Sequence, residues 1–497
     1  MVNPDFPITH TSLLWFYCLL LLWALSKKNM VGAYILLGLI ALDVVWNNVT
    51  GHKEMLLHTA QDMFLIAGIT AFFLWSKDNL VKVLVLIAGT YSFYWVHNNM
   101  TPHSQQNSTH EVSMELLVQF VSKQELQTWI SDHGSEYSIT YPLFQPQDET
   151  FLLDEYILLE CDLDNSESLM KALSLHHAID HVEINDNIEL PELSSVASSE
   201  YEINSRLNDP YINKQKQQGP YDLDKFHKLT DKHKIKSLSD PVVIAILDTG
   251  VDASHEDLKD NYISTSRRYD TDIKGHGTHC AGIAAAVTGN KIGIASLVPN
   301  GSPIKVTSVK VLNNYGMGTQ KTIIDGIIKA ADSGYDVISM SLGSVSSDAK
   351  QKAYNTAVAY AHSKGAIVVA AAGNSNRDAR DYSPANSKGI IAVSAVDSLL
   401  RRASFANDVN GLEMGISAPG TQIFSTFPED EYKAFNGTSM SAPLVSGLIG
   451  LMKSYKKDLK AKEAYTIIKK SALKKDGILI LDPYKAMELF FSNHLES

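Results

Sequence analysis

Charged residues divide this chain into two parts that suit different solvents. Residues 1–100 carry ten Asp, Glu, Lys and Arg side chains, whereas the rest of the chain carries 88. Because so few charges cannot cover a water-facing surface of that length, we expect the first part to lie in a membrane. The formal charge of the whole chain is −12, which leaves no chain-wide basic field to attract phosphate groups. Nucleic acid is therefore not an expected partner.

Four apolar runs make up this first part, over residues 8–26, 30–46, 63–75 and 80–96. A helix needs about 20 residues to cross ~30 Å of hydrocarbon, so the first, second and fourth runs are long enough. The run 63–75 is short, and it either extends backward or forms half of a re-entrant hairpin. We predict an all-α transmembrane segment of about four helices over residues 1–97, in contact with the lipid bilayer.

Lysines between the apolar runs predict the orientation of this segment. Lys27 and Lys28 lie between the first two runs, and Lys77 lies between the last two. Since loops that carry Lys and Arg stay in the cytoplasm, four spans place everything after residue 97 outside it, in the periplasm or at the cell surface. Three spans would place the C-terminal part in the cytoplasm instead. The expectation is a multi-pass membrane protein with an extracytoplasmic C-terminal part.

A small α+β domain is expected at residues 113–190, after a polar linker at 98–112. Strand-like runs (MELLVQFVS, YILLECDL and HVEINDNIEL) surround two helical patterns, one through Trp129 and one in SESLMKALSLH. A strand–helix–strand–strand–helix–strand order predicts a ferredoxin-like split βαβ domain. Residues 191–207 begin with proline and are rich in serine, which is typical of an accessible linker.

Side chains with complementary chemistry lie in separate motifs of the C-terminal part. Asp248 ends the apolar run VVIAILD, His276 lies in GHGTHCAG, and Ser439 begins an apolar helix in GTSMSAP. A serine hydroxyl becomes a nucleophile when a neutral imidazole takes its proton and a carboxylate orients that imidazole. Asn374, which closes the run AIVVAAAGN, can donate to a developing oxyanion together with a backbone N–H at the helix start. The motifs predict nucleophilic acyl transfer.

Neighbouring residues leave other chemistries open. His276 and His279 lie one helical turn apart and could bind zinc, but no glutamate lies between them and no third ligand is evident. Cys280 invites a thiol mechanism, although the serine motif already supplies a nucleophile, so we interpret Cys280 as a residue packed beside the site. The three cysteines, Cys18, Cys161 and Cys280, lie in different segments and predict no disulfide framework.

Five motifs, DTGVD, GHGTHCAG, SLG, AAAGN and GTSMSAP, occur in the order found in the subtilisin-like serine proteases (subtilases), which this chain resembles over residues 208–455. Cys280 after GHGTH, with the stretch DARDYSPAN, is most similar to the proteinase K branch. The second half of 113–190 resembles the inhibitory propeptide of the same family. The resemblance implies an α/β fold with a doubly wound, mostly parallel sheet over residues 208–497, preceded by the propeptide domain.

The resemblance also implies a role for each candidate residue, with no cofactor in catalysis. Asp248 would orient His276, which acts as general base and then acid, and Ser439 would attack the scissile carbonyl. Asn374 and the Ser439 N–H would hold the oxyanion. Polypeptide substrates are expected to pair as an added strand with two segments and to meet a pocket wall of small residues. The two pairing segments are Gly316, Met317 and Gly318, and Ser341, Leu342 and Gly343. The pocket wall is formed by Ala371, Ala372 and Gly373.

A structural calcium ion is a further implication of the resemblance. The family's site matches Asp257, Val287, Asn290, Ile292 and Ile294, and oxygen ligands of this kind suit Ca²⁺. The alternative is a solvent-facing aspartate beside an ordinary turn.

We therefore predict a membrane-anchored serine endopeptidase made as a zymogen, with its own propeptide as an intramolecular inhibitor. Self-cleavage is expected within 191–207, at the Leu193–Ser194 bond, because leucine suits an apolar pocket and no proline follows it. Two alternatives remain. One is a catalytically silent binding or sensor module on the same fold, and the other is a membrane sensor or transporter with a protease-like tail.

Overall fold

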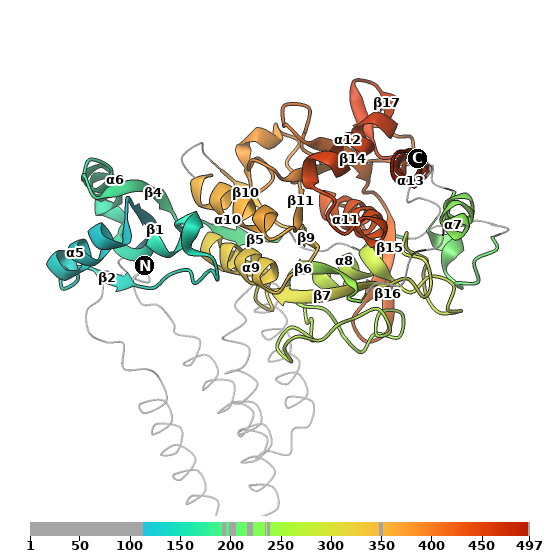
Figure 1. Cartoon of the computed structure of the whole chain (residues 1–497), viewed down its shortest axis with the longest axis horizontal. Coiled ribbons are helices and arrows are strands. Elements are labelled where there is room, and N and C mark those ends of the chain that lie inside the picture. Colours follow the sequence, from blue (N-terminus) through green and yellow to red (C-terminus); the bar gives the residue numbers. More distant parts are fainter. Residues whose placement is uncertain are drawn as a thin grey trace, which may run out of the picture. The chain divides into compact units, whose positions relative to one another are not determined.

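The structure is a computed structural model, and it describes residues 113–190, 195–197, 205–215, 222–233, 235, 239–346 and 351–495 (Figure 1). Within these ranges no helix combines the length and apolar character needed to span a bilayer. The predicted transmembrane segment 1–97, the linker 98–112 and the Leu193–Ser194 bond lie outside the described residues.

The N-terminal domain, residues 113–190, is a four-stranded antiparallel sheet with two helices. Its elements are β1 (Ser113–Phe120), α5 (Lys123–His133), β2 (Ser138–Thr140), β3 (Tyr156–Asp162), α6 (Ser166–Ser174) and β4 (Ile179–Ile184), with sheet order β2-β3-β1-β4. Alternate residues of β1 face opposite sides: Leu116 and Val118 pack with Trp129 of α5, whereas Leu117 packs in a second cluster. Both faces of this small sheet are therefore covered.

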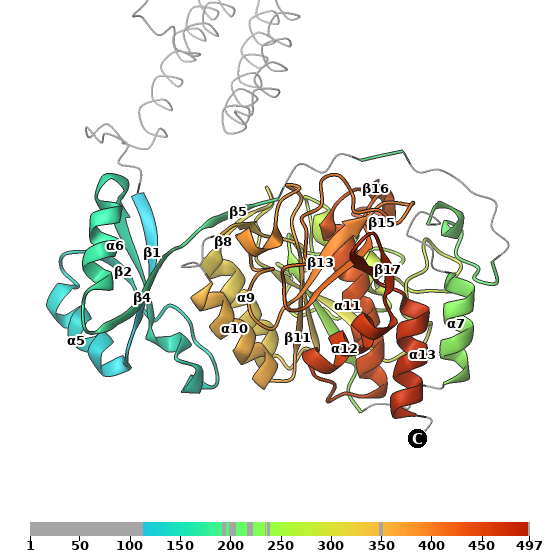
Figure 2. The same ribbon diagram turned by 90° about the horizontal axis from the view of Figure 1, so that it is seen from above.

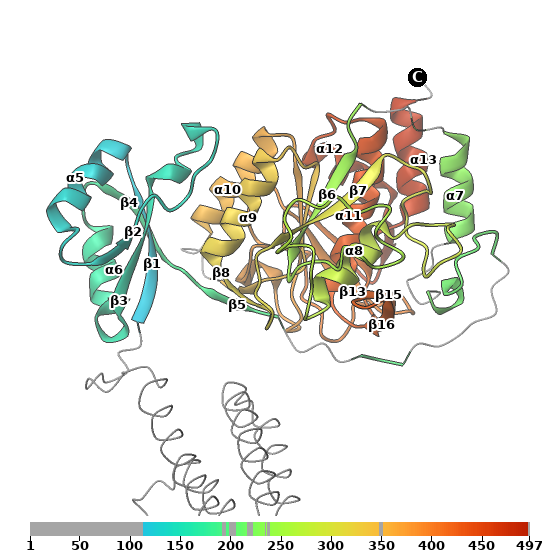
Figure 3. The ribbon, with the colours of Figure 1, turned by 90° about the horizontal axis from the view of Figure 1, so that it is seen from below.

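The predicted strand over 181–190 is wrong as a single element. The strand β4 ends at Ile184, and β5 (Asn187–Glu189) pairs antiparallel with β8 (Met317–Thr319) (Figure 3). Asn185 and Asp186 form the break, since residues of these types favour turns. The end of the N-terminal domain thus becomes a strand on the C-terminal part.

The C-terminal domain contains an eight-stranded sheet in the order β17-β18-β14-β13-β11-β9-β6-β7, parallel except for the β17–β18 pair. Its strands are β6 (Val242–Asp248), β7 (Ile304–Lys310), β9 (Val337–Met340), β11 (Ile367–Ala371), β13 (Ile391–Val396), β14 (Gly415–Pro419), β17 (Leu473–Lys475) and β18 (Ile478–Ile480). The expectation of an α/β domain with a mostly parallel sheet is confirmed.

Helices cover both faces of this sheet (Figure 2). On β6, Ile244 and Ile246 belong to one apolar cluster, whereas Ala245 and Leu247 belong to another. The first cluster includes α8 (His276–Ala285), α11 (Thr438–Tyr455), α12 (Ala461–Ser471) and α13 (Pro483–His494), and the second includes α9 (Gln320–Asp332) and α10 (Lys352–Ser363). As a result, every residue of β6 is buried.

The remaining described α-helix and strands lie outside the eight-stranded sheet. They are α7 (Leu223–Lys232), the hairpin of β15 (Ile423–Phe427) with β16 (Glu431–Phe435), and the short pair of β10 (Ser344–Val345) with β12 (Tyr382–Ser383). The sheet neighbours β6, β9 and β11 all end at one edge, because parallel strands share a direction. That edge collects Asp248, the segment 341–343 and the segment 371–374.

Candidate active site

Asp248 and His276 form a buried hydrogen-bonded pair at this edge. His276 Nδ1 lies 2.8 Å from Asp248 Oδ1 and 2.9 Å from Oδ2. Burial alone would lower the pKa of His276, but the charge and hydrogen bond of Asp248 outweigh it and raise that pKa. The carboxylate holds the proton on Nδ1, so Nε2 is left as the basic nitrogen.

Local backbone geometry places His276 at the first position of α8. Gly275 precedes it with φ +84°, and the ring of Phe427 occupies the space that a β-carbon there would need. Both the left-handed backbone and the close ring require glycine. This explains why glycine stands directly before the histidine.

Ser439 lies at the start of α11 and contacts both neighbouring segments. Its hydroxyl donates to the Ser341 carbonyl oxygen at 3.2 Å, and its own carbonyl accepts from Ser341 Oγ at 2.8 Å and from Cys280 Sγ at 3.5 Å. Among the described residues, no hydrogen bond joins Ser439 Oγ to His276. The serine is thus beside the histidine helix, with its hydroxyl turned toward β9.

Cys280 completes a compact group with the first pair. Ligand atoms of Asp248, His276 and Cys280 lie within 4.8 Å of one another, and this is the one such group of acidic, histidine or cysteine side chains in the described part of the chain. Burial raises the pKa of the Cys280 thiol well above its ordinary value, so the thiol stays protonated. His279 is not part of the group: its Nε2 lies 3.0 Å from the Lys433 carbonyl oxygen, and burial lowers its pKa to about 3.

Asn374 and the Ser439 backbone border one small space. Asn374 Oδ1 accepts from the Thr438 N–H at 2.9 Å and from Thr438 Oγ1 at 3.0 Å, so its amide nitrogen points away from Thr438. A β-carbon at Gly437 would lie 3.5 Å from Asn374 Nδ2 and 3.6 Å from the Ser439 nitrogen. Because glycine leaves that space free, two N–H donors can face one oxygen there.

Two of the three predicted substrate segments contact the start of α11. Ser341 bonds it directly, as described above, and Leu342 and Gly343 continue from Ser341. Gly373 N donates to Thr438 Oγ1 at 3.1 Å, and Ala371 and Ala372 are buried beside it. The third segment, Gly316 to Gly318, is occupied by β5: Ile188 pairs with Gly318, and Leu190 N donates to the Gly316 carbonyl at 2.9 Å.

The five residues of the predicted calcium site converge in one loop cluster. Asp257 accepts from Asn290 Nδ2 at 2.9 Å and from the Ile294 N–H at 2.8 Å, and its carbonyl accepts from the Val287 N–H at 3.0 Å. Asn290 Oδ1 accepts from the Ile292 N–H at 2.8 Å. Burial raises the pKa of Asp257 to about 8.

Comparison with known proteins identifies the family. The sequence profile described as "Subtilase family" matches residues 239–484. Thermitase from Thermoactinomyces vulgaris is 44% identical over 217 residues, which are 42% of this chain and 74% of thermitase. The chain belongs to the subtilase family. Accordingly it is a serine endopeptidase that acts on polypeptides, as the motifs predicted.

Two further similar proteins are a subtilisin and a protease of known structure. Subtilisin DY from Bacillus licheniformis is 42% identical over 220 residues, which are 43% of this chain and 77% of that protein. The solved structure of a protease from Pseudoalteromonas arctica is 28% identical, with a TM-score of 0.49, and it covers 57% of this chain and 100% of its own.

Asp272 is a residue of this subtilase that sequence reasoning missed. Its Oδ1 accepts from Thr249 Oγ1 and the Gly275 N–H, and its Oδ2 accepts from the N–H and hydroxyl of Thr278, all at 2.8 Å. Asp272 therefore ties the residue after Asp248 to the first turn of the histidine helix. Its place four residues before His276 was the available signal.

Asp209 was also missed. It is buried, and it accepts from the Gly289 N–H at 2.7 and 2.9 Å beside the Asp257 cluster. Burial raises the pKa of Asp209 to about 6, and its charge adds to the raised pKa of Asp257. Among the described residues, neither carboxylate forms an ion pair with a Lys or Arg side chain. Two buried carboxylates without a cation partner fit a divalent ion. No local motif surrounds Asp209, so its sequence position gave no signal.

Proposed function

We propose that this subtilase is a membrane-anchored serine endopeptidase, made as a zymogen, that cleaves peptide bonds with Asp248, His276 and Ser439. The observation that carries the catalytic part is the Asp248–His276 pair beside the N-terminus of α11. Substrate is held as a strand along 316–318 and 341–343, with the segment 371–373 as a pocket wall.

In the proposed reaction, Ser439 Oγ turns from Ser341 toward His276 Nε2 and gives its proton to that nitrogen as Oγ attacks the scissile carbonyl carbon. The carbonyl oxygen becomes negative and accepts from Asn374 Nδ2 and the Ser439 N–H. His276 then protonates the leaving nitrogen as the C–N bond breaks, and an ester to Ser439 remains. Water attacks this ester, giving a proton to His276, which returns it to Ser439.

Fluorophosphonate labelling tests this assignment. Wild-type protein should label at Ser439, and Ser439→Ala should not. Labelling on intact cells with and without permeabilisation also tests the proposed membrane position, in which residues 1–97 anchor the chain and the catalytic domain lies outside the cytoplasm. Labelling only after permeabilisation would contradict an accessible cell-surface position.

The proposed role of the N-terminal domain is that of the inhibitory propeptide, with a ferredoxin-like fold. Its support is the β5–β8 pairing, which fills an edge predicted for substrate. Glu183 accepts from the Ala353 N–H of α10 at 3.1 Å, and Asn185 accepts from the Lys321 N–H of α9 at 2.8 Å, so the domain also caps two catalytic-domain helices.

Self-cleavage is proposed within 191–207, at Leu193–Ser194. Mass spectrometry of the wild type and of Ser439→Ala tests it: the cleaved terminus should appear only in the wild type. An identical terminus in both proteins would mean that another protease makes the cut.

Calcium is proposed as a structural ion at Asp257, Asp209 and Asn290, with backbone carbonyls of Val287, Ile292 and Ile294 as further ligands. It would neutralise the two buried carboxylates and would take no part in the chemical steps. We also propose, on Cys280 and the stretch DARDYSPAN, that the chain stands near the proteinase K branch.

A further inference from the structure

A cavity of about 740 Å³ lies at the outer edge of the eight-stranded sheet, beside β7. Its lining comes from the end of β7, the turn that follows, β8, α9 and the loop that carries Arg268 and Tyr269. This volume is typical of a ligand site. None of the four proposed catalytic residues lines the cavity, so it is separate from the active site.

Two cations of this cavity lie against one aromatic ring. The Arg268 guanidinium carbon is 4.9 Å and Lys329 Nζ is 4.4 Å from the centroid of the Tyr269 ring, and Lys329 Nζ also donates to the Tyr269 hydroxyl at 2.8 Å. Contacts of this kind position a cation but do not neutralise it. Within the described ranges of the chain, neither cation forms an ion pair with a carboxylate.

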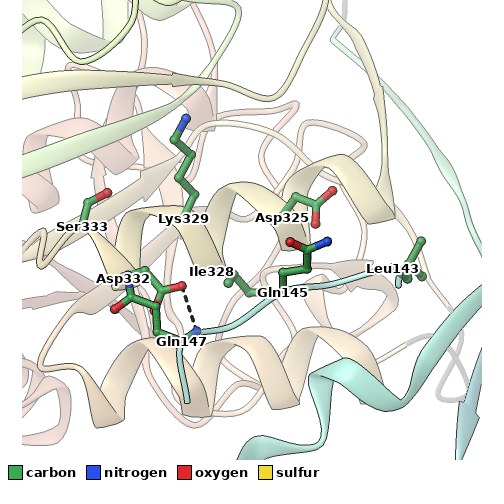
Figure 4. A pocket seen from close by; sticks show the side chains of 8 residues that line it. All are labelled: Leu143, Gln145, Gln147, Asp325, Ile328, Lys329, Asp332 and Ser333. Carbon is green, nitrogen blue, oxygen red and sulfur yellow. Dashed lines mark hydrogen bonds between the residues drawn. The ribbon is translucent and has the colours of Figure 1, made fainter. Parts of the chain in front are cut away.

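Figure 4 shows the direction of Lys329 on α9. Its side chain extends away from Gln145 and Gln147 of the N-terminal domain, which line a neighbouring cavity of about 460 Å³ on this helix. The charged end of Lys329 therefore lies on the side of Tyr269 and is not covered by the N-terminal domain.

Lys310 supplies a third cation, from the end of β7. Its Nζ donates to Asn314 Oδ1 at 2.9 Å and to the Thr249 carbonyl oxygen, so both of these acceptors are uncharged. Burial lowers the pKa of Lys310, and the charge of Arg268 acts in the same direction, against the carboxylates of the active-site edge. Arg268 therefore lies near Lys310 as well as near Lys329.

Donors outnumber acceptors in this cavity. Its described lining holds one carboxylate, Asp325, which pairs with Lys321 at 2.6 Å. Asn313 Oδ1 accepts from two backbone N–H groups at 2.9 and 3.1 Å, and Asn314 Oδ1 accepts from Lys310, so the amide nitrogens of both asparagines are left as donors. On a chain with a formal charge of −12, the cavity is a local positive site that suits carboxylates.

The cavity borders the edge on which substrate is proposed to pair. Met317 and Thr319 of β8 line it, and in the β5–β8 pair they lie opposite Glu189 and Asn187. Opposite residues of an antiparallel pair point to the same face. Glu189 and Asn187 are exposed, whereas Ile188 between them is 1% exposed. A substrate in this register would direct the side chains at the same two positions toward the face of β8 that borders the cavity.

We propose that this cavity is a subsite for acidic substrate side chains, which takes aspartate or glutamate at the positions opposite Met317 and Thr319. Arg268, Lys310 and Lys329 supply its positive charge. The inference rests on the proposed function and deepens it by naming the preferred substrates. They are polypeptides with two acidic residues, separated by one position, before the cleaved bond.

Binding of an acidic probe tests the cavity without any need for activity. The full chain with Ser439→Ala is titrated calorimetrically with triglutamate at low salt. Triglutamate should bind, and Arg268→Gln or Lys329→Gln should each weaken binding about fivefold, because each removes one charge contact. Binding should be lost at about 1 M salt, where the screening length is ~3 Å.

Two further variants control for charge and for position. Lys329→Arg keeps the charge and should retain binding. Lys388→Gln removes an exposed lysine that does not line the cavity, and it should bind triglutamate as the parent does. Thermal unfolding of each variant detects misfolding. Lys310 is left unchanged, because it bonds the backbone next to Asp248.

Cleavage by the wild type tests the preference. Quenched fluorogenic peptides keep the residues at the positions of Ile188 and Leu190, which are buried and set the register. They carry glutamate, glutamine or lysine at the positions of Asn187 and Glu189. We expect kcat/KM to be about tenfold higher for the glutamate peptide than for the glutamine peptide, and lowest for the lysine peptide. Arg268→Gln should bring the glutamate-to-glutamine ratio toward one.

Equal kcat/KM for the glutamate and glutamine peptides would overturn the proposal, while cleavage of both would leave the proposed function standing. Absence of triglutamate binding would also overturn it, and so would equal binding by Lys329→Gln and Lys388→Gln. If the wild type cleaves none of the peptides, the proposed function fails, and the triglutamate titration alone decides whether the cavity binds acidic chains.

Discussion

The Ser439 hydroxyl donates to the Ser341 carbonyl oxygen, not to the imidazole of His276. Ser341 begins a segment on which substrate is proposed to pair. A substrate N–H that bonds this carbonyl would therefore compete with the hydroxyl and favour its rotation toward Nε2. Catalytic hydrogen bonds often form only when substrate is bound.

Asn374→Ala should reduce kcat by about 10²–10³ and leave KM nearly unchanged, because an oxyanion donor acts on the transition state. Steady-state kinetics on a peptide substrate check this. Asn376→Ala, on the following turn, is the control and should retain activity. A rise in KM with kcat unchanged would place Asn374 in substrate binding instead.

Asp272→Asn should lower both kcat and stability while KM changes little. Only the oxygen of the asparagine amide can accept a hydrogen bond, so some of the donors from Thr249, Gly275 and Thr278 lose their acceptor. Each buried group left unpaired should lower the free energy of unfolding by about 1–3 kcal/mol. Thermal unfolding and kinetics measure the two effects. Asp270→Asn, two residues away on the same loop, is the comparison, and an equal loss of kcat there would contradict a specific positioning role.

The pH dependence should follow His276. Its neutral form is the base, so kcat/KM should fall about tenfold for each pH unit below its raised pKa. Asp248→Asn removes the charge that raises this pKa, so the acid limb should move to lower pH while kcat falls by on the order of 10⁴. An unchanged acid limb in Asp248→Asn would contradict the assignment.

The same pair has a defined effect on stability. Since the folded-state pKa of His276 is raised, the protonated pair stabilises the fold below the unfolded pKa of histidine, and this contribution is lost as pH rises through the folded pKa. Denaturant unfolding of the wild type and Asp248→Asn across that range should diverge at low pH and converge at high pH.

Removal of calcium should lower the Tm. An ion present at about 100 times its Kd stabilises a fold by about 2.7 kcal/mol, so chelation of the wild type should produce a clear shift. Asp257→Asn should lose most of that shift, whereas Asp260→Asn, on the same loop, should keep it. The absence of any shift in the wild type would rule out the proposed ion.

Cys280→Ala should retain activity within a few-fold. Burial raises the pKa of the thiol, and the thiol donates to the Ser439 carbonyl oxygen. Iodoacetamide should therefore leave the native enzyme active, and inactivation by it would show an accessible thiolate.

The sequence was most informative where function depends on short motifs. Asp248 ends β6, His276 begins α8, and Ser439 lies in the first turn of α11, whereas Asn374 follows the end of β11 by three residues. Local patterns and a shared sheet edge were enough to predict that these residues lie at one edge of the sheet. The rest depends on tertiary contacts. Asp272 and Asp209 gain their roles from distant backbone N–H groups, and the Ser439 rotamer depends on Ser341.

The break at Asn185 and Asp186 shows the same distinction. Alternation continued from 181 to 190, so the pattern indicated one strand, but β5 finds its partner in β8 more than a hundred positions later. Such pairing is decided by the shape of the assembled domains.

The β5–β8 pairing has a kinetic consequence. A strand supplied by the same chain competes at an effective concentration on the order of millimolar, so even a weakly bound tail would exclude micromolar substrates from the uncut protein. After the linker between the two domains is hydrolysed, the tail would compete only at its concentration in solution. We therefore expect a lag before the enzyme reaches its full turnover rate.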